Sequence, residues 1–172
     1  MNKVSMEKIL RSIVILVDTR EKKNLHILNW FIENNIKYKN LKLDFGDYSF
    51  MIPKDEEIGV TEDVIYKDKI AIERKNSLNE ISGNFTRGRE RFAREFKRAK
   101  EKGCDIRLVI EEADYSDIDK GKYSKMNPKS MKGSIHSFDS KFDLPVVFIP
   151  KECTGDYIYN RFYYWLRNKL EK

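Results

Sequence analysis

Four short runs of branched apolar residues constrain the fold of this chain more than any other feature. They lie at residues 13–17, 70–72, 106–110, where only Arg107 is polar, and 146–149. Continuous apolar runs of this length are typical of strands that are buried on both faces of a sheet. Segments with apolar residues at helical spacing separate or follow them, at about residues 23–35, 86–103, 128–142 and 155–170. This alternation predicts an α/β sandwich, in which helices cover a central sheet.

The length of 172 residues, with 40% hydrophobic residues, suits one domain with a sizeable core. We expect a single domain over residues 1–172, with its core at about 13–170. No apolar stretch approaches the roughly 20 residues needed to span a bilayer, and no small-residue cleavage site follows the first apolar run. We therefore expect an intracellular protein of the cytoplasm, nucleoid or nucleus, without a membrane partner. Two cysteines without CxxC spacing indicate neither a disulfide framework nor a zinc site.

Three local patterns give more detailed predictions. Residues 38–52 alternate in polarity around a turn at Gly46-Asp47, which predicts a bent strand or a hairpin. An exposed acidic loop is expected over residues 54–63, and a short helix is expected after Ser77, with Glu80 completing a capping box. The buried stripe of the first helix is expected to consist of Leu25, Leu28, Phe31 and Ile32.

The positive charge is concentrated in two segments. The formal net charge is +6, and residues 86–102 hold eight basic and three acidic side chains. Residues 120–134 hold five lysines and no acid. Both segments are candidate phosphate-binding surfaces, and the alternative is a solvated helix face followed by a flexible loop. The candidate DNA-binding residues are Arg20, Arg87, Arg89, Arg91, Arg94 and Arg98.

Acidic residues lie where the predicted strands end, and a Glu-x-Lys tripeptide is among them. Carboxylates at Asp18, Asp47 and Glu73 are the hard oxygen ligands that Mg²⁺ or Mn²⁺ takes in phosphodiester hydrolysis. Lys75 should share a face of the strand with Glu73, to orient water or stabilise developing negative charge, while Arg74 points to the other face. The alternatives are an ordinary turn at Gly46-Asp47 and a helix N-cap at Asp18.

The order of these motifs resembles that of the XPF-type nuclease domain. Its characteristic residues are matched by VDTRE at 17–21, GD at 46–47, ERK at 73–75 and LVIE at 108–111, and the resemblance covers about residues 13–170. It implies a restriction-endonuclease-like core, a mixed sheet flanked by helices, that cleaves DNA near junctions of duplex and single strand in repair or recombination. It also implies that Asp47 and Glu73 bind the metal and that Lys75 is catalytic.

The resemblance has consequences for neighbouring positions as well. Arg74 belongs to the active-site motif, while Asp18 and Glu21 lie at the edge of the site, Asp18 as a candidate ligand through water. The last acidic position of the family motif falls on Asn79, with Glu80 next to it. The chain has no counterpart of the helix-hairpin-helix domain that many family members use to grip duplex DNA, so a partner subunit is one way to set its substrate preference.

Three functional readings are compatible with these residues. An active endonuclease is favoured, because a catalytically silent DNA-binding or scaffolding subunit has no reason to keep the carboxylates and the lysine together. Another nuclease of the same superfold, such as a junction resolvase or restriction enzyme, would differ in substrate. His26 and His136 are expected to be structural. The aromatic residues at 157–165 are expected to pack in the core, and part of the set is a candidate surface for a homodimer or a partner subunit.

Overall fold

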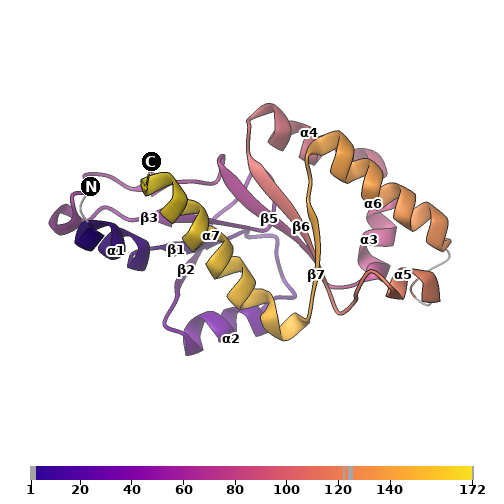
Figure 1. Cartoon of the computed structure of the whole chain (residues 1–172), viewed down its shortest axis with the longest axis horizontal. Coiled ribbons are helices and arrows are strands. Elements are labelled where there is room, and N and C mark those ends of the chain that lie inside the picture. Colours follow the sequence, from indigo (N-terminus) through magenta and orange to yellow (C-terminus); the bar gives the residue numbers. More distant parts are fainter. Residues whose placement is uncertain (1–2, 122, 124–125, 172) are drawn as a thin grey trace.

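A computed structural model describes residues 3–121, 123 and 126–171, apart from the side chains of Lys3 and Val4. Lys122 and Lys125 of the predicted lysine-rich loop lie outside the described residues. A seven-stranded mixed sheet forms the centre of the described fold, in the order β2-β1-β3-β5-β6-β7, with β4 paired to β3 (Figure 1). The strands are β1 (Val14–Val17), β2 (Lys37–Asn40), β3 (Tyr48–Ile52), β4 (Val64–Ile65), β5 (Ile70–Lys75), β6 (Asp105–Glu111) and β7 (Val146–Ile149).

Helices cover both faces of this sheet, each with its own apolar core. Aromatic and aliphatic residues of α1 (Lys3–Arg11), α2 (Leu25–Glu33) and α7 (Thr154–Leu170) pack on one face. Residues of α3 (Leu78–Phe85), α4 (Arg89–Glu101), α5 (Asp117–Lys120) and α6 (Pro128–Phe142) pack on the other. Short 3₁₀ turns occur at Glu56–Ile58 and Lys151–Cys153. The predicted fold class is confirmed: the architecture is α/β and restriction-endonuclease-like.

Several predicted elements are confirmed closely, because strong local signals mark their ends. Helix α6 begins at Pro128, after an Asn127 side chain that accepts a hydrogen bond from the Ser130 amide. Ser77 caps α3 in the same way, by accepting from the amide of Glu80. The Glu80 carboxylate accepts from the amide of Asn76, one residue before the cap, so the first bond of the predicted capping box is present and the returning bond is shifted by one residue.

Two predictions of local structure are wrong, and one helix was missed. Residues 38–52 form no hairpin, because β1 lies between β2 and β3, parallel to the first and antiparallel to the second. In α2 the buried residues are Ile27 and Phe31, whereas Leu25 and Ile32 are 69% and 62% exposed. Helix α1 was not predicted. Alternating polarity reports which side chains are buried, and it does not report which strand is the neighbour.

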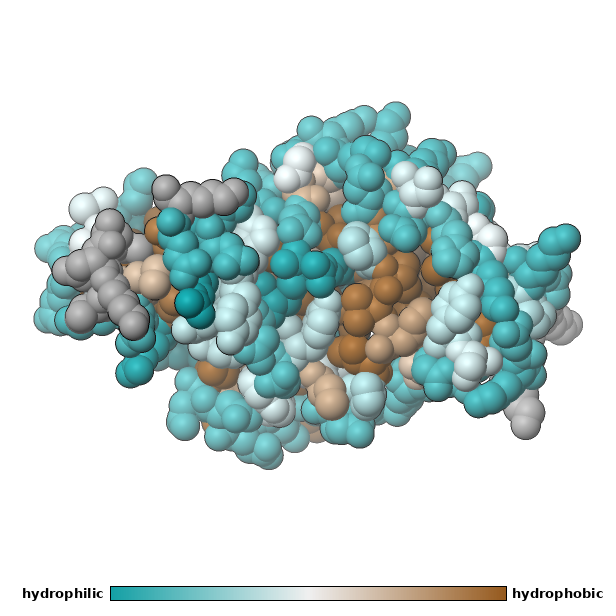
Figure 2. Space-filling view, viewed as in Figure 1, coloured by the Kyte–Doolittle hydropathy of each residue, from teal (hydrophilic) through white to brown (hydrophobic). Residues whose placement is uncertain are grey.

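The tripeptide of residues 73–75 forms the carboxyl end of β5, as expected, and β5 lies in the middle of the sheet. Strand β7, in contrast, pairs only with β6 among the described strands, and its four apolar residues are partly exposed. Figure 2 shows an apolar area at the surface beside β7. In the described part of the chain, no helix has both the length and the apolar character that crossing a membrane requires.

Candidate active site

Strand register brings the predicted acidic residues together. Val17 is paired with Tyr48, and Tyr48 is paired with Ile72. The adjoining residues Asp18, Asp47 and Glu73 therefore lie side by side. The amide of Asp18 donates to the carbonyl of Asp47 at 2.8 Å, and the amide of Asp47 donates to the carbonyl of Ile72 at 2.8 Å. Backbone hydrogen bonds therefore hold this end of the sheet together without involving any side chain.

Gly46 allows the chain to turn into β3 at this point. Its φ of 72° lies in the left-handed region, which favours glycine. A Cβ at this position would lie 3.0 Å from Cβ of Ala71 and 3.1 Å from the carbonyl oxygen of Ile72. Both backbone conformation and close approach to β5 thus require glycine immediately before Asp47.

Asp47, Glu73 and Lys75 converge on one face of the sheet. Lys75 Nζ lies 2.5 Å from Glu73 Oε1 and 5.3 Å from the ring centroid of Phe92 on α4. Asp47 Oδ2 accepts the backbone amide of Arg74 at 2.8 Å. Glu73 and Lys75 are buried, and Asp47 is partly buried. As predicted from strand geometry, Glu73 and Lys75 share one face while Arg74 points away.

Burial and mutual repulsion change the acidity of this group. Loss of water raises the pKa of Asp47, the charge of Glu73 raises it further, and Lys75 opposes both effects. Burial likewise raises the pKa of Glu73, against the attraction of Lys75. Burial alone would lower the pKa of Lys75, but Glu73 and Asp47 outweigh it, and the net pKa is raised. Lys75 is therefore a permanent cation rather than a proton acceptor.

A cleft of about 420 Å³ opens over these residues. Asp47, Glu73 and Lys75 form its floor with Gly46 and Phe92, while side chains from α4 and from the loop after β1 surround them. The surrounding polar residues are Arg20, Asn84, Arg91, Arg94, Glu95 and Arg98. Carboxylates beneath a rim of arginines suit a phosphodiester, because the arginines can contact its anionic phosphate and the carboxylates can hold a divalent cation beside it.

The structure distinguishes among the predicted arginines. Arg91, Arg94 and Arg98 line this cleft, and Arg87 lines a neighbouring hollow between α3 and α4. Arg89 turns to α6 instead: its Nη1 donates to Ser134 Oγ at 2.9 Å, and its guanidinium lies 5.2 Å from the Phe138 ring centroid. Arg89 therefore joins two helices, and its geometry does not support the predicted contact with phosphate.

The second predicted basic segment is partly neutralised within the described residues. Lys120 pairs with Asp117 at 2.5 Å, and Lys132 pairs with Asp119 at 2.7 Å. Those two aspartates lie on α5, just before the lysine-rich loop and outside the segment of residues 120–134. This segment is therefore a weaker candidate for phosphate binding than α4.

Asp18 directly follows β1, as its sequence pattern predicted, but its carboxylate is occupied by other partners. Its two oxygens accept four hydrogen bonds, three from the amide and guanidinium of Arg20 and one from the amide of Leu43. Although burial opposes it, these bonds lower the pKa of Asp18. With both oxygens engaged, Asp18 is not placed as a metal ligand. The N-cap alternative is also wrong, because Asn24 precedes the first residue of α2.

Arg74 is held on the opposite face by a buried ionic network. Its guanidinium donates to Glu21 at 2.9 Å and to Glu111 at 2.7 Å. Glu111 also accepts from Thr154 Oγ1 at 2.6 Å and lies 2.8 Å from His26 Nε2. His26 thus has a structural contact, as expected, and His136 contacts the hydroxyl of Tyr115 at 2.9 Å. The network connects β5 and β6 to α2 and α7.

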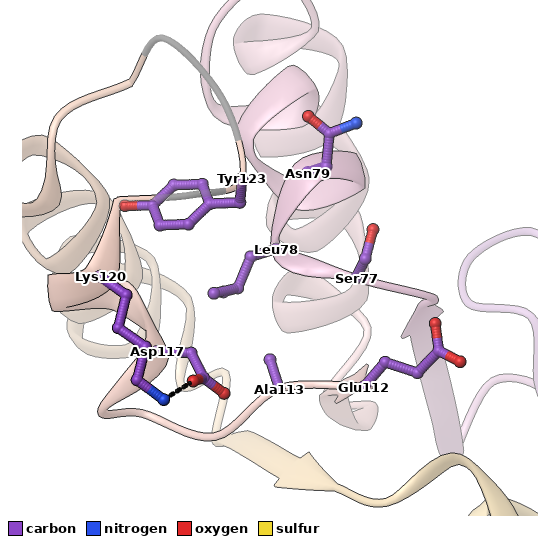
Figure 3. Close-up of a pocket in the computed structure, with 8 residues that line it drawn as sticks. All are labelled: Ser77, Leu78, Asn79, Glu112, Ala113, Asp117, Lys120 and Tyr123. Atoms are coloured by element: carbon purple, nitrogen blue, oxygen red, sulfur yellow. Dashed lines mark hydrogen bonds and ion pairs between the residues drawn. The ribbon is translucent and has the colours of Figure 1, made fainter.

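The last acidic position of the family motif falls on Asn79, and the side chains of Asn79 and its neighbour Glu80 lie in different surroundings. Asn79 lines a separate pocket beyond the carboxyl ends of β5 and β6, with Ser77, Leu78, Glu112 and Tyr123 among its other residues (Figure 3). Glu80 lies beside the active-site group, with Oε1 at 3.9 Å from Lys75 Nζ.

Two acidic residues near the site were not predicted as part of it. Besides Glu80, the side chain of Glu95 on α4 reaches the cleft, and its Oε1 accepts the amide of Gly46 at 3.0 Å. Glu95 sits in a basic helix, where it was counted only as a charge. Glu95 follows buried Phe92 by three residues, on the opposite side of the helix from the exposed lysines. This spacing was the signal that Glu95 points toward the fold.

The donor set fits a small divalent cation that keeps much of its water. Asp47 and Glu73 offer carboxylate oxygens, whereas the described residues contain no group of three or more acidic, histidine or cysteine side chains able to enclose a metal. Mg²⁺ commonly binds through one or two carboxylates, with water and substrate phosphate completing its shell. Two desolvated carboxylates with raised pKa values would gain from such a cation.

Comparisons with known proteins agree with this geometry. The ERCC4 domain matches residues 17–160. XPF from Aeropyrum pernix has a similar structure, with a TM-score of 0.65 and 14% identity over 92% of this chain and 67% of that chain. Its complex with DNA gives a TM-score of 0.62 and 16% identity over 91% of this chain and 66% of that chain. The chain thus spans about two thirds of their length, and curated proteins yield no match.

The raised pKa of Asp47 predicts a pH-dependent stability. Protonated Asp47 favours the folded state, so this contribution is complete below the ordinary carboxyl pKa of about 4 and is lost as pH rises through the raised value. In chelator, Asp47→Asn should therefore increase the free energy of unfolding at neutral pH, by about 1.4 kcal/mol for each unit of raised pKa. Denaturant titrations from pH 4 to 8 measure the difference, which should disappear at the acid end.

A matched control removes the same charge from the same loop. Asp44 is exposed and lies 3.8 Å from Lys67. Asp44→Asn should not stabilise the protein at neutral pH. A destabilised Asp47→Asn protein at pH 8 would contradict the assignment of charge repulsion at this site.

Proposed function

The chain belongs to the ERCC4 domain family, and on this premise we propose that it is a metal-dependent DNA endonuclease. The proposed substrate is branched DNA or DNA with a junction of duplex and single strand, in repair or recombination. One observation carries the proposal: Asp47, Glu73 and Lys75 meet at the floor of a cleft with arginines at its rim. Phosphodiester hydrolysis needs this combination of cation-binding carboxylates, a fixed positive charge and contacts to phosphate.

Each residue has a distinct part in the proposed reaction. Asp47 and Glu73 hold Mg²⁺ or Mn²⁺, which when bound supplies Lewis-acid polarisation of the phosphate and activation of the attacking water. Lys75, fixed by Glu73 and by the Phe92 ring, donates hydrogen bonds toward the charge that develops on phosphate. The side chain of Arg74 lies on the opposite face, and its backbone amide orients the Asp47 carboxylate. Asp18 orients Arg20 at the rim and binds no metal in this proposal.

The arginines of α4 are proposed to hold the DNA backbone. Arg91, Arg94 and Arg98 line the cleft, and the structure of XPF in complex with DNA among the similar folds is consistent with a DNA ligand. Arg87 and Arg20 extend this positive surface to either side. Contacts of this kind recognise phosphate rather than base sequence, so specificity would follow DNA shape.

Cleavage should require a divalent metal. Because all the proposed ligands are oxygen donors, Mg²⁺ and Mn²⁺ should both support activity, and EDTA should abolish it. The assay incubates the purified chain with linear, flapped, forked and four-way DNA, and we expect the branched forms to be cut. The proposal would be overturned by full activity in excess chelator, or by no cleavage of any of these DNAs with either metal.

Chemistry and binding should be separable by mutation. Glu73→Gln and Asp47→Asn remove charge from the floor without changing the rim, so the cleavage rate at saturating DNA should fall by orders of magnitude while DNA affinity is kept or increased. Replacing Arg91, Arg94 and Arg98 by Ala should weaken binding and reduce its salt dependence by about one unit of slope for each lost contact.

The control for the arginine variants is Arg89→Ala, whose guanidinium contacts α6. Its salt dependence of binding should match that of the unmodified protein. Normal cleavage by Glu73→Gln would refute the metal assignment, and joint loss of binding and cleavage in that variant would indicate a structural role.

We further propose that the domain acts as a dimer or with a partner subunit. Strand β7 has an unpaired edge among the described strands and four partly exposed apolar residues, and Tyr164 on α7 is 51% exposed. Apolar surface of this kind is commonly covered in an assembly. The other aromatic residues of α7 are largely in the core, where Trp165 contacts Phe50 and Tyr66.

A homodimer should give twice the chain mass of 20.5 kDa in light scattering. Phe148→Lys places a charge on the proposed surface and should shift the mass toward the monomer, whereas the same change at exposed Leu25 on α2 should not. A strictly monomeric mass at concentrations well above those used for activity would exclude the homodimer.

A further inference from the structure

Glu95 makes a contact that none of the proposed catalytic roles requires. It lies on α4, among arginines, and its side chain is partly buried in the wall of the cleft. Its Oε1 accepts the backbone amide of Gly46 at 3.0 Å. This hydrogen bond, donated by the backbone amide to the carboxylate, joins two elements that are 49 residues apart.

The Gly46 amide matters because the next residue is Asp47, a proposed metal ligand. The turn has no side chain of its own at Gly46, and the sheet holds Asp47 through the carbonyl of Ile72 and the amides of Asp18 and Arg74. Two hydrogen bonds reach this loop from α4: Arg98 Nη2 donates to the carbonyl of Asp44 at 3.5 Å, and Glu95 accepts the amide of Gly46, the residue next to Asp47. Removing Glu95 would leave the Gly46 amide to water and let the turn shift relative to α4.

Helix α4 is itself firmly placed on the sheet. Phe92 and Phe96 are buried against each other with ring centroids 4.6 Å apart, and both contact Phe138 of α6. The cleft residues Arg91, Arg94 and Arg98 lie on this same helix. The helix that lines the phosphate side of the cleft thus also contacts the turn that carries Asp47.

We propose that Glu95 is a positioning residue that fixes the Gly46-Asp47 turn to α4, so that one rigid helix sets both the metal ligand Asp47 and the phosphate-binding arginines. The inference rests on the proposed function and adds to it a residue that acts through Asp47. Glu95 acts as a hydrogen-bond acceptor and not as a metal ligand.

Three substitutions at position 95 separate the hydrogen bond from the charge. Glu95→Gln keeps an oxygen acceptor at the same reach and removes the charge. Glu95→Asp keeps the charge and withdraws the acceptor by one methylene, and Glu95→Ala removes both. The control is Glu101→Ala, which removes a carboxylate from the exposed end of α4, where it lies 3.8 Å from Lys97.

The first two measurements need no catalysis. Hydrogen exchange of the Gly46 amide, followed by NMR in metal-free protein, should be slow in the unmodified, Glu95→Gln and Glu101→Ala proteins and fast in the Ala and Asp variants. Mn²⁺ affinity, measured by calorimetry, should fall on the order of 10-fold in the Ala and Asp variants and stay within about threefold in the other two, as is usual when a residue that orients a ligand is lost.

Cleavage provides the third measurement. In the Ala and Asp variants the single-turnover rate at saturating DNA should fall on the order of 10-fold, while the dissociation constant for DNA stays within about threefold. A Glu95→Gln protein as defective as Glu95→Ala would overturn the inference, because the charge would then be the active feature. Unchanged Gly46 exchange in Glu95→Ala would overturn it as well.

The two proposals fail in different ways. If the unmodified protein binds Mn²⁺ but cuts no DNA, the nuclease proposal fails, and the Gly46 exchange and Mn²⁺ affinities still decide whether Glu95 positions Asp47. If the Ala variant does not fold, the Asp variant decides, since it retains the charge and lacks the reach.

Discussion

The close approach of the Gly46 backbone to β5 is the constraint on which the rest of the site depends. No side chain fits between Gly46 and the carbonyl of Ile72, so the chain enters β3 in a left-handed conformation with Asp47 directly above β5. Asp47 then lies next to Glu73 because their neighbours Tyr48 and Ile72 are paired. A glycine and strand register therefore place the two residues side by side.

The two faces of strand β5 carry the proposed catalytic residues on one side and a buried ionic network on the other. Glu73 and Lys75 project into the cleft, and Arg74 between them projects into a network with Glu21 and Glu111. Buried ion pairs are costly to assemble, and removing one partner leaves an uncompensated charge. Because the Arg74 amide also donates to Asp47, the ionic network on one face supports the position of a carboxylate on the other.

Sequence patterns predicted the parts of this arrangement that depend on local signals. Periodicity located most helices and strands, and the two-residue repeat of a strand placed Glu73 and Lys75 on one face. Strand order is not a local property, so the position of β1 between β2 and β3 was missed. Contacts across the fold were missed for the same reason, among them Glu95 on Gly46 and Arg89 on Ser134. An acidic residue in a basic helix has no sequence signal that names its partner.

The acidity of the cleft bears on whether the chain is an enzyme or a silent DNA-binding subunit. Burying Asp47 beside Glu73 raises the pKa values of both carboxyl groups, which means that their charged forms destabilise the folded protein. A domain selected only to bind DNA would gain by losing one of these carboxylates, because both repel phosphate as well as each other. Lys75 offsets part of this repulsion, but it too is buried and would be costly without Glu73. Glu73 and Lys75 therefore depend on each other, whereas the Asp47 carboxylate costs stability; all three have a use when a cation and a phosphate enter the cleft together, which favours the active enzyme.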